Sequence, residues 1–485
     1  MLNLPLISRI LGFLLAIVGF FLIICSGLAS FYEEREVWAF LYAALCNIGG
    51  GGLLLFLGRK AERRFMPRDG YLVVAATWVL CSAGGTLPFL FSAHITSFTD
   101  AFYTCMSSFT GTGFSCLPHI ASLPHSILFW HTLMQWIGGL GIVFFTIAVL
   151  PLWGITGVQL FAVEATGMGK DRLHPRIGVT ARRIWGLYLL LTLLQALLLQ
   201  VGGMPLFDSI CHALSTTSTG GFSTPNAVQL ITQSSYLQYI VSIFMYLSGL
   251  NFIVLYLLLS GRARRVWQND EVKWYTSSVL LFTGIVALML IMHSGRDWEE
   301  GFRSALFHVA SIHSSTGFST EDLNLWPNFI WFILLALMVC GGCSGSTSGG
   351  IKSIRVLLLW RVIRGEFRRI LHPGIVLPLH VNRRPITTQV VITSIILVLL
   401  FLILALVFAF LCMDQGHSFT GAISYSLAAL GNTGVALGEF QNPDYLSSLS
   451  PLCKWLSSFM MLIGRLELFT VLLLFTPGFW RRGAF

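Results

Sequence analysis

The stretch Thr110-Gly111-Thr112-Gly113-Phe114-Ser115 decides the fold, because three related stretches follow it along the chain. They are Ser218-Thr219-Gly220-Gly221-Phe222-Ser223, Ser314-Ser315-Thr316-Gly317-Phe318-Ser319 and Gly431-Asn432-Thr433-Gly434-Val435-Ala436. Aligned on the last glycine, successive copies lie 108, 96 and 117 residues apart. Repetition of the same residue types at a similar spacing indicates four copies of one structural unit.

Each copy lies between two apolar segments long enough to cross a bilayer, which takes about 20 residues. An apolar run of about 12 residues, too short to span, comes directly before each copy. Ten long segments are predicted, at 8–30, 37–58, 70–92, 125–151, 183–203, 234–260, 274–294, 327–362, 387–413 and 451–476. Each unit is therefore predicted to consist of a span, a re-entrant short helix, an extended strand and a second span.

The composition supports a membrane protein. Hydrophobic residues make up 55% of the chain and charged residues 11%, whereas soluble domains have roughly 25% charged residues. The net charge of +9 does not indicate a nucleic-acid partner, because the basic residues form short clusters between apolar runs. The ten cysteines show no CxxC pairs or regular spacing, so neither a metal site nor a disulfide framework is indicated.

The basic clusters also predict the orientation. They fall in alternate connections, at 59–68, 170–183, 262–273, 361–384 and 481–482. The intervening connections are poorer in Lys and Arg and carry acidic residues. Because short basic loops stay in the cytoplasm, both termini are expected there.

The repeated stretches have the residue types of a carbonyl-lined ion filter. Non-helical backbone at membrane depth is tolerated where it lines a wet cavity, and four strands around one axis would create such a cavity. Glycine allows successive carbonyls to point the same way, and rings of carbonyls can replace the water around a cation. No acidic residue lies within the repeats, which favours a monovalent cation over calcium.

The predicted ion ligands are backbone carbonyls of sixteen residues in four filter loops. The loops are Thr110, Gly111, Thr112 and Gly113; Ser218, Thr219, Gly220 and Gly221; Ser314, Ser315, Thr316 and Gly317; and Gly431, Asn432, Thr433 and Gly434.

These four units, with Thr110-Gly111-Thr112-Gly113 in the first, resemble the superfamily of Trk, Ktr and plant HKT potassium transporters. The two extra N-terminal spans and the break at 341–350 resemble its bacterial TrkH branch, and the resemblance covers essentially the whole chain. It implies potassium ion uptake across the bacterial inner membrane, with the last glycine of each loop tied to potassium preference. All four of those positions are glycine here, whereas Val435 departs from the phenylalanine of the other copies.

The resemblance also implies partners and a division of the chain. A TrkA-like, nucleotide-binding cytoplasmic ring would regulate transport as a separate protein, and the chain would form a homodimer in the lipid bilayer. The fold class is an all-α membrane protein with four pseudo-symmetric units around one pore. The expected parts are two extra helices at 1–68 and pore units at 69–175, 176–268, 269–372 and 373–485.

The broken eighth segment is predicted to be an unwound loop, because each glycine costs a helix roughly 1 kcal/mol relative to alanine. In the family, such a loop obstructs the pore and must move for conduction. The alternative is a static contact that lets helices pack closely. The predicted gate comprises Gly342, Ser344, Gly345, Ser346, Thr347, Ser348, Gly349, Gly350 and Arg465.

Two other motifs overlap this segment and are rejected. Gly345 to Lys352 approaches a phosphate-binding loop, but Ile351 interrupts the pattern and no soluble strand precedes it. Gly342 to Gly345 matches the GxSG of an intramembrane serine protease, but the nearest histidines belong to the third pore loop, on the opposite side of the broken span.

Arg465 lies midway along the tenth segment, where a charged residue costs at least about 2.5–3.5 kcal/mol unless it faces protein or water. Glu467 is two residues away and cannot pair with it within one helix. One reading makes Arg465 an electrostatic barrier or latch below the filter, and the other makes it part of a structural ion pair. Lys352 is expected at the cytoplasmic interface, and the histidines, which lack ligand spacing, are interpreted as structural.

Two other functions are weighed against a gated channel. A proton- or sodium-coupled symporter would need a titratable or ion-binding group along the pathway, and the spans carry few charges besides Arg465. A membrane enzyme would need a catalytic set, which the sequence does not offer. The chain is therefore not expected to be an enzyme.

Overall fold

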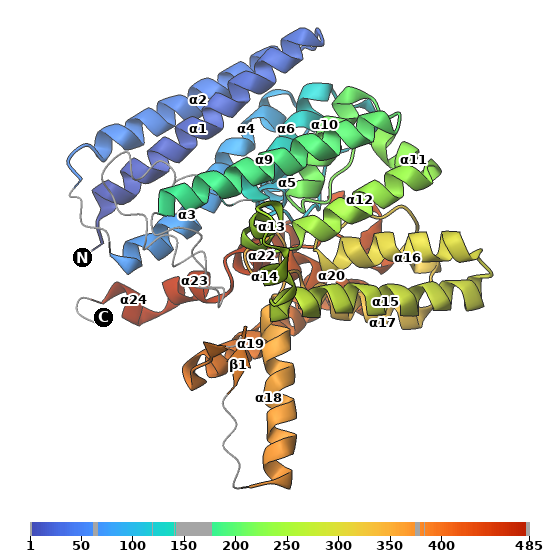
Figure 1. The fold of residues 1–485 in the computed structure, drawn as a ribbon. Coiled ribbons are helices and arrows are strands. Elements are labelled where there is room, and N and C mark those ends of the chain that lie inside the picture. The colour runs from blue at the N-terminus through green and yellow to red at the C-terminus, as the bar shows by residue number, and fades with distance from the viewer. Residues whose placement is uncertain are drawn as a thin grey trace.

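A computed structural model of the protein describes residues 2–61, 66–118, 120–139, 141, 177–373, 379–382 and 384–481. Of the fourth predicted span and the basic connection after it, residue 140 and residues 142–176 lie outside this description. Figure 1 shows a bundle of helices from which α18 (Ser353–Leu371) projects away. The described strands are the antiparallel pair β1 (His380–Val381) and β2 (Arg384–Pro385).

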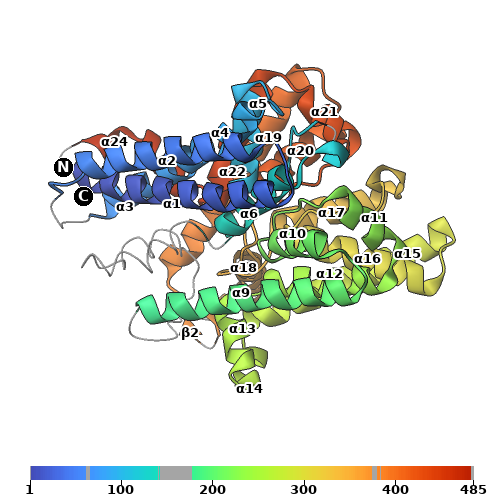
Figure 2. The same cartoon turned by 90° about the horizontal axis from the view of Figure 1, so that it is seen from above.

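The first two helices form an antiparallel pair, α1 (Leu4–Phe31) and α2 (Val37–Leu57). Glycines permit their close approach, since a Cβ on Gly12 would lie 2.6 Å from the carbonyl oxygen of Gly51. Asn47 joins the pair to the rest of the protein through a hydrogen bond from its Nδ2 to the carbonyl of Gly84, at 3.1 Å. Both termini lie at the same end of the bundle, opposite α11 (Figures 1 and 2).

The remaining helices repeat one arrangement four times. The first spans are α3 (Pro67–Gly85) with α4 (Leu87–Phe91), α9 (Ile177–Val201), α15 (Asp270–Ser294) and α19 (Thr388–Asp414). The short pore helices are α5 (Phe98–Thr110), α10 (Leu206–Thr217), α16 (Trp298–His313) and α20 (Phe419–Gly431). The second spans begin with α6 (His125–Gly139), α12 (Ser235–Ser248), α17 (Asn328–Cys340) and α22 (Pro451–Arg465).

Shorter helices connect or extend these elements. They are η1 (Ile120–Ser122), α11 (Pro225–Gln233), α13 (Phe252–Leu259), α14 (Ala263–Trp267), η3 (Leu323–Leu325), η4 (Gly438–Gln441), α21 (Pro443–Ser447), α23 (Phe469–Leu472), η5 (Leu473–Phe475) and α24 (Pro477–Trp480). Pore helices sit at the centre of the protein: in α5, every residue from Ala101 to Thr110 is buried.

Six helices among the described residues are long and apolar enough to cross a membrane, or up to eight if each of two bent pairs is one span. The sixth and tenth predicted spans were expected to be continuous, and this was wrong. Helices α12 and α13 meet at 110°, and α22 meets α23 and η5 at 113°. In the first bend, Asn251 caps α13 by accepting a hydrogen bond from the N–H of Ile253 at 2.8 Å.

The second bend contains two residues in the left-handed region, Glu467 (φ 54°) and Leu468 (φ 53°), which a continuous helix excludes. The eighth span is interrupted at 341–352, as the glycines predicted. The predicted fold class is confirmed: an all-helical membrane protein of four pseudo-symmetric units with two additional N-terminal helices. The residue boundaries between the units stay predictions.

Candidate functional site

The four filter loops share one backbone conformation. The residue two positions before the last glycine is left-handed in every loop, namely Gly111 (φ 69°), Thr219 (φ 54°), Ser315 (φ 54°) and Asn432 (φ 52°). The last glycines also have positive φ, at 98° for Gly113, 78° for Gly221, 85° for Gly317 and 72° for Gly434. Threonine and serine rarely adopt this region, so surrounding contacts must impose it.

The loops form a closed ring. A Cβ atom on Gly113 would lie 2.6 Å from the carbonyl oxygen of Gly220 in the second loop. The same test places Gly221 against the carbonyl of Thr316, Gly317 against that of Thr433, and Gly434 against that of Thr112. This sequence of contacts returns to the first loop, and any side chain at the four glycines would collide with a neighbouring carbonyl.

Polar side chains hold the loops in register. Asn432 donates a hydrogen bond from Nδ2 to Oγ1 of Thr112 at 2.9 Å, which links the fourth loop to the first. Gln135 of α6 donates from Nε2 to the carbonyl oxygen of Gly220 at 2.8 Å, which links the first unit to the second loop. Sequence reasoning missed Gln135, because nothing in a lone glutamine within an apolar helix marks its distant partner.

In the first three units, the side chain nine positions before the last glycine braces the strand that follows the loop. Thr104 accepts a hydrogen bond from the N–H of Cys116 at 3.1 Å. His212 and Ser223 lie within hydrogen-bond distance, 3.0 Å from Nδ1 to Oγ, and so do His308 and Ser319, 3.3 Å from Nε2 to Oγ. These contacts give the two histidines a structural role. Over the described part of the chain, no group of three or more His, Cys, Asp or Glu could hold a metal ion.

The break in the third unit lies against the inner ends of several filter loops. Thr347 donates through Oγ1 to the carbonyls of Thr217 and Ser248, at 3.2 and 3.3 Å. Ser315 accepts a 2.5 Å hydrogen bond at its Oγ from the N–H of Gly349. Gly349 also packs so closely on the carbonyl of Gly431 that a side chain would not fit. The segment 341–352 thus contacts the second, third and fourth units at once.

Arg465 lies at the end of α22 and is held by backbone carbonyls. Its Nη1 donates to the carbonyl of Thr347 at 2.6 Å, within the broken segment. Its Nη2 donates to the carbonyls of Gly138 and Gly139 in α6, both at 2.7 Å. The guanidinium also lies 5.8 Å from the ring centroid of Trp78. Arg465 therefore joins the fourth unit to the first unit and to the broken segment.

The remaining predicted gate residues lie together in the same segment. Ser348 accepts at Oγ from the N–H of Gly342 at 2.8 Å, and the Oγ of Ser346 donates to the carbonyl of Cys343 at 2.5 Å. The carbonyl of Gly345 accepts from the N–H of Phe252 at 3.1 Å. The left-handed residues Gly341, Gly345 and Gly350 turn the chain back on itself.

A carboxylate that the sequence did not single out also binds this segment. Glu271, at the start of α15, accepts a 2.5 Å hydrogen bond at Oε1 from the N–H of Ser344. Its side chain is 5% exposed, so it lies within the protein rather than on its surface. In the sequence it lies in the basic connection 262–273, just before the seventh predicted span, and nothing there marks it as buried.

The expectation for Lys352 was wrong. It is buried, with positive φ, and its ammonium group donates to the carbonyl of Ser348. Arg355, one turn further, donates from Nη2 to Oε2 of Glu467 at 2.5 Å. The reason is that α18 begins inside the protein, so its first residues meet the bend in the fourth unit instead of water.

Comparison with known proteins places the chain in a family. Residues 38–481 match the family model for TrkH, described as a cation transport protein. The chain belongs to the TrkH family. A relative called Trk system potassium uptake protein TrkH in Salmonella typhimurium is 35% identical over 98% of this chain and 99% of that protein. A relative of the same name in Escherichia coli is also 35% identical, with the same coverage.

A solved structure supports the same assignment. The crystal structure of the potassium transporter TrkH from Vibrio parahaemolyticus is similar to this chain with a TM-score of 0.87 and 32% sequence identity. The match covers 98% of this chain and 99% of that one. The resemblance inferred from the filter loops is therefore confirmed over nearly the whole length, including the two N-terminal helices. The matched TrkH proteins are transport proteins.

Proposed function

We propose that the protein takes up potassium ions across the bacterial inner membrane through the ring of four filter loops. The observation that carries this proposal is the closed contact sequence of Gly113, Gly221, Gly317 and Gly434 with the carbonyls of the neighbouring loops. A dehydrated cation at such a ring is coordinated by backbone oxygens, as in other carbonyl filters. Relatives named as potassium uptake proteins support potassium as the cargo.

We propose further that the segment 342–350 and Arg465 form the gate. The segment packs against the inner side of the loops, and Arg465 bonds to the carbonyl of Thr347 within it. A positive charge held there opposes the passage of a cation, and movement of the segment would release both obstruction and charge. A cytoplasmic TrkA-like ring that binds nucleotides would drive this movement, acting on a homodimer whose termini face the cytoplasm.

The test is ion flux into liposomes that contain the purified protein. We expect potassium uptake to exceed sodium uptake, and Gly113→Ser to reduce this preference. Gly284→Ser is the matched control, because Gly284 lies in α15 with open space around it. Equal potassium and sodium fluxes in the unmodified protein would refute the proposed filter.

A proton- or sodium-coupled symporter is the second candidate, and one observation favours it. The buried carboxylate of Glu271 touches the broken segment, so a titratable group adjoins the proposed gate. Reversal potentials separate the candidates. A channel follows the potassium gradient alone, whereas a symporter shifts its reversal potential when the proton or sodium gradient changes.

A further inference from the structure

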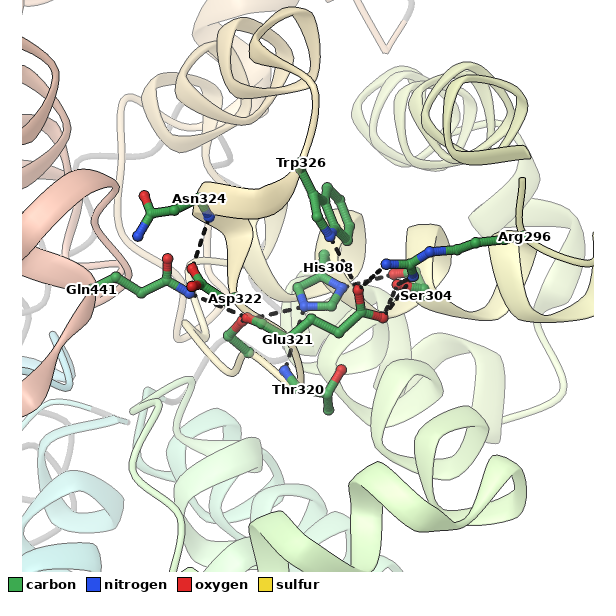
Figure 3. Close-up of polar contacts among 10 residues, drawn as sticks. Arg296, Ser304, His308, Thr320, Glu321, Asp322, Asn324, Trp326 and Gln441 are labelled. Atoms are coloured by element: carbon green, nitrogen blue, oxygen red, sulfur yellow. Dashed lines mark hydrogen bonds and ion pairs between the residues drawn. The ribbon is translucent and has the colours of Figure 1, made fainter. Parts of the chain in front are cut away.

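Glu321 follows the third filter loop in the chain, and its carboxylate accepts several hydrogen bonds (Figure 3). Arg296 donates from Nη1 to Oε1 at 2.9 Å and from Nη2 to Oε2 at 2.6 Å, a two-point ion pair. Ser304 donates from Oγ to Oε1 at 2.6 Å, and Trp326 donates from Nε1 to Oε2 at 3.1 Å. One carboxylate therefore accepts four hydrogen bonds from three side chains.

These contacts tie together both ends of the third pore loop. Ser304 lies in α16, before the filter, and Glu321 lies four residues after Gly317. Ser304 and Trp326 are both 3% exposed, so the cluster is packed into the protein even though Arg296 and Glu321 keep some contact with solvent. An exposed ion pair alone contributes little, but a two-point pair fixed by buried neighbours constrains geometry.

The same cluster reaches the fourth unit. The carbonyl of Glu321 accepts a hydrogen bond from Nε2 of Gln441 at 3.2 Å, as Figure 3 shows. Asn324 and Gly438 exchange two hydrogen bonds, at 2.7 and 3.2 Å. A shift of Glu321 would therefore also displace the segment that follows the fourth filter loop.

The other units hold the corresponding region with different chemistry. In the second unit, Thr224 donates from Oγ1 to Oδ1 of Asp208 at 2.5 Å. In the first unit, Asp100 pairs with Lys454 at 2.7 Å. In the fourth, Ser418 donates to Glu439 through its N–H and its hydroxyl, at 2.8 and 2.6 Å. A carboxylate clamp at the outer end of the pore helix is therefore a feature of all four units.

We propose that Glu321, clamped by Arg296, is a positioning residue that fixes the third filter loop and so sharpens the discrimination between potassium and sodium. This inference rests on the proposed carbonyl filter and assigns a determinant outside it. The strand from Gly317 to Glu321 is short, so a displaced Glu321 lets the carbonyl of Thr316 move relative to Gly221. A filter that relaxes around a smaller ion loses selectivity while it still conducts.

The charges around Glu321 determine the pH range in which its carboxylate stays ionised and the clamp stays intact. Burial acts to raise the pKa of Glu321, but hydrogen bonds from Arg296 and Ser304, together with the charges of His308 and Arg296, hold it at about 2. Besides these groups, Asp322 adjoins Glu321 in the chain, and Glu300 of α16 lies near Arg296. Glu439 lines the same pocket as Asp322. Because the pKa is lowered, the clamp is complete at neutral pH and is lost only as the pH falls toward 2.

The experiment compares potassium and sodium fluxes in liposomes between pH 8 and pH 4. The unmodified protein should show a constant potassium preference, and Glu321→Gln should lower it about tenfold at every pH, as expected for loss of a charge-assisted contact. Arg296→Gln removes the strongest interaction that lowers the pKa of Glu321, so its preference should fall further as the pH drops from 7 to 4. Arg296→Lys should restore part of the preference and the constant profile.

Arg303→Gln is the control, because Arg303 lies on α16 beside Ser304 but bonds to the half-exposed Glu299 and to Gln238 rather than to Glu321. It should leave the potassium preference unchanged. An unchanged preference in both Glu321→Gln and Arg296→Gln overturns the proposal, and so does a lower melting temperature with normal selectivity. If the unmodified protein itself fails to prefer potassium, the result refutes the proposed filter rather than the role of Glu321 in positioning it.

Discussion

The filter ring and the layer directly beneath it differ in symmetry. In the ring, four loops repeat the same left-handed residues and the same contact with the next loop. Beneath it, the second spans all end or bend, but in different ways. Helix α6 ends at Gly139, the second and fourth units bend within three residues at 249–251 and 466–468, and the third is interrupted over 341–352.

This difference separates two tasks that one pore must perform. In the proposed filter a cation at the centre would meet all four loops, so selectivity would require the same backbone in each. An obstruction needs only one unit to depart from the pattern, and in the proposed gate the third unit supplies it.

The largest effect is expected from deleting 344–350. The deletion removes Thr347, which contacts the end of the second pore helix at Thr217, and Gly349, which contacts the third filter loop. It also removes the carbonyl that holds Arg465. Potassium flux without the cytoplasmic partner should rise about a hundredfold or more, because obstruction and charge are released together. Thr347→Val is a smaller step that removes only the hydroxyl and should give a modest increase. Lower or equal flux in well-folded deletion protein would show that the segment is not an obstruction.

Arg465→Ala should give the next largest increase. At an effective dielectric constant of 20, two unit charges 4 Å apart repel by about 4 kcal/mol, which would slow conduction about a thousandfold if fully felt. Because such a barrier shrinks with distance and with screening by ions, we expect flux in the resting state to rise about tenfold to a hundredfold and the response to the regulator to weaken.

The structural reading of Arg465 predicts the opposite result. Loss of its bonds to Thr347, Gly138 and Gly139 would then lower the melting temperature without extra flux. Liposome uptake and melting temperature measured on one preparation decide between the two. Reduced stability with unchanged flux would show that Arg465 has no part in gating.

Substitutions in the ring should change selectivity rather than opening. Gly113→Ser should reduce the potassium preference about tenfold, because the residue needs a φ of 98° and its Cβ would lie 2.6 Å from the carbonyl of Gly220. Gly317→Ser and Gly434→Ser should be worse and impair folding, since their Cβ atoms would overlap the facing carbonyls. Flux ratios and yields of folded protein test this order. Equal effects at all three positions would contradict the ring geometry.

The sequence predicted the ring better than the layer beneath it. The four copies can be recognised in the sequence because each needs positive φ at the same position. Glycine adopts positive φ most readily, so this backbone conformation selects a glycine there. Thr219, Ser315 and Asn432 carry no such signature, because distant contacts impose their conformation.

The errors in the prediction have the same physical origin. The bend at Glu467 lies in an apolar stretch that a helix pattern fits well, and its stabilising partner, Arg355, is more than a hundred residues away. Lys352 was placed at the membrane surface because basic residues usually mark it, whereas the carbonyl of Ser348 binds it inside the protein. Contacts between remote segments decide such positions, and no window along the chain contains both partners.

The smallest effect is expected from Glu467→Gln, which tests how the bent fourth unit is tied to the third. Arg355 is 6% exposed and Glu467 is 15% exposed, so their 2.5 Å contact is largely shielded from solvent. Glutamine keeps the size of the side chain and one acceptor but loses the charge. A charge-assisted hydrogen bond exceeds a neutral one by about 1 kcal/mol, which corresponds to about a fivefold change in resting flux.

A double-mutant cycle with Arg355→Gln separates this link from general damage. If the pair connects the two units, the double variant should change flux no more than either single variant does. Glu366→Gln is the matched control, because it removes a carboxylate from an exposed pair with Arg369 on the same helix, α18, and such pairs contribute little. Additive effects of Glu467→Gln and Arg355→Gln would show that the two side chains act independently and that the bend is held by its backbone alone.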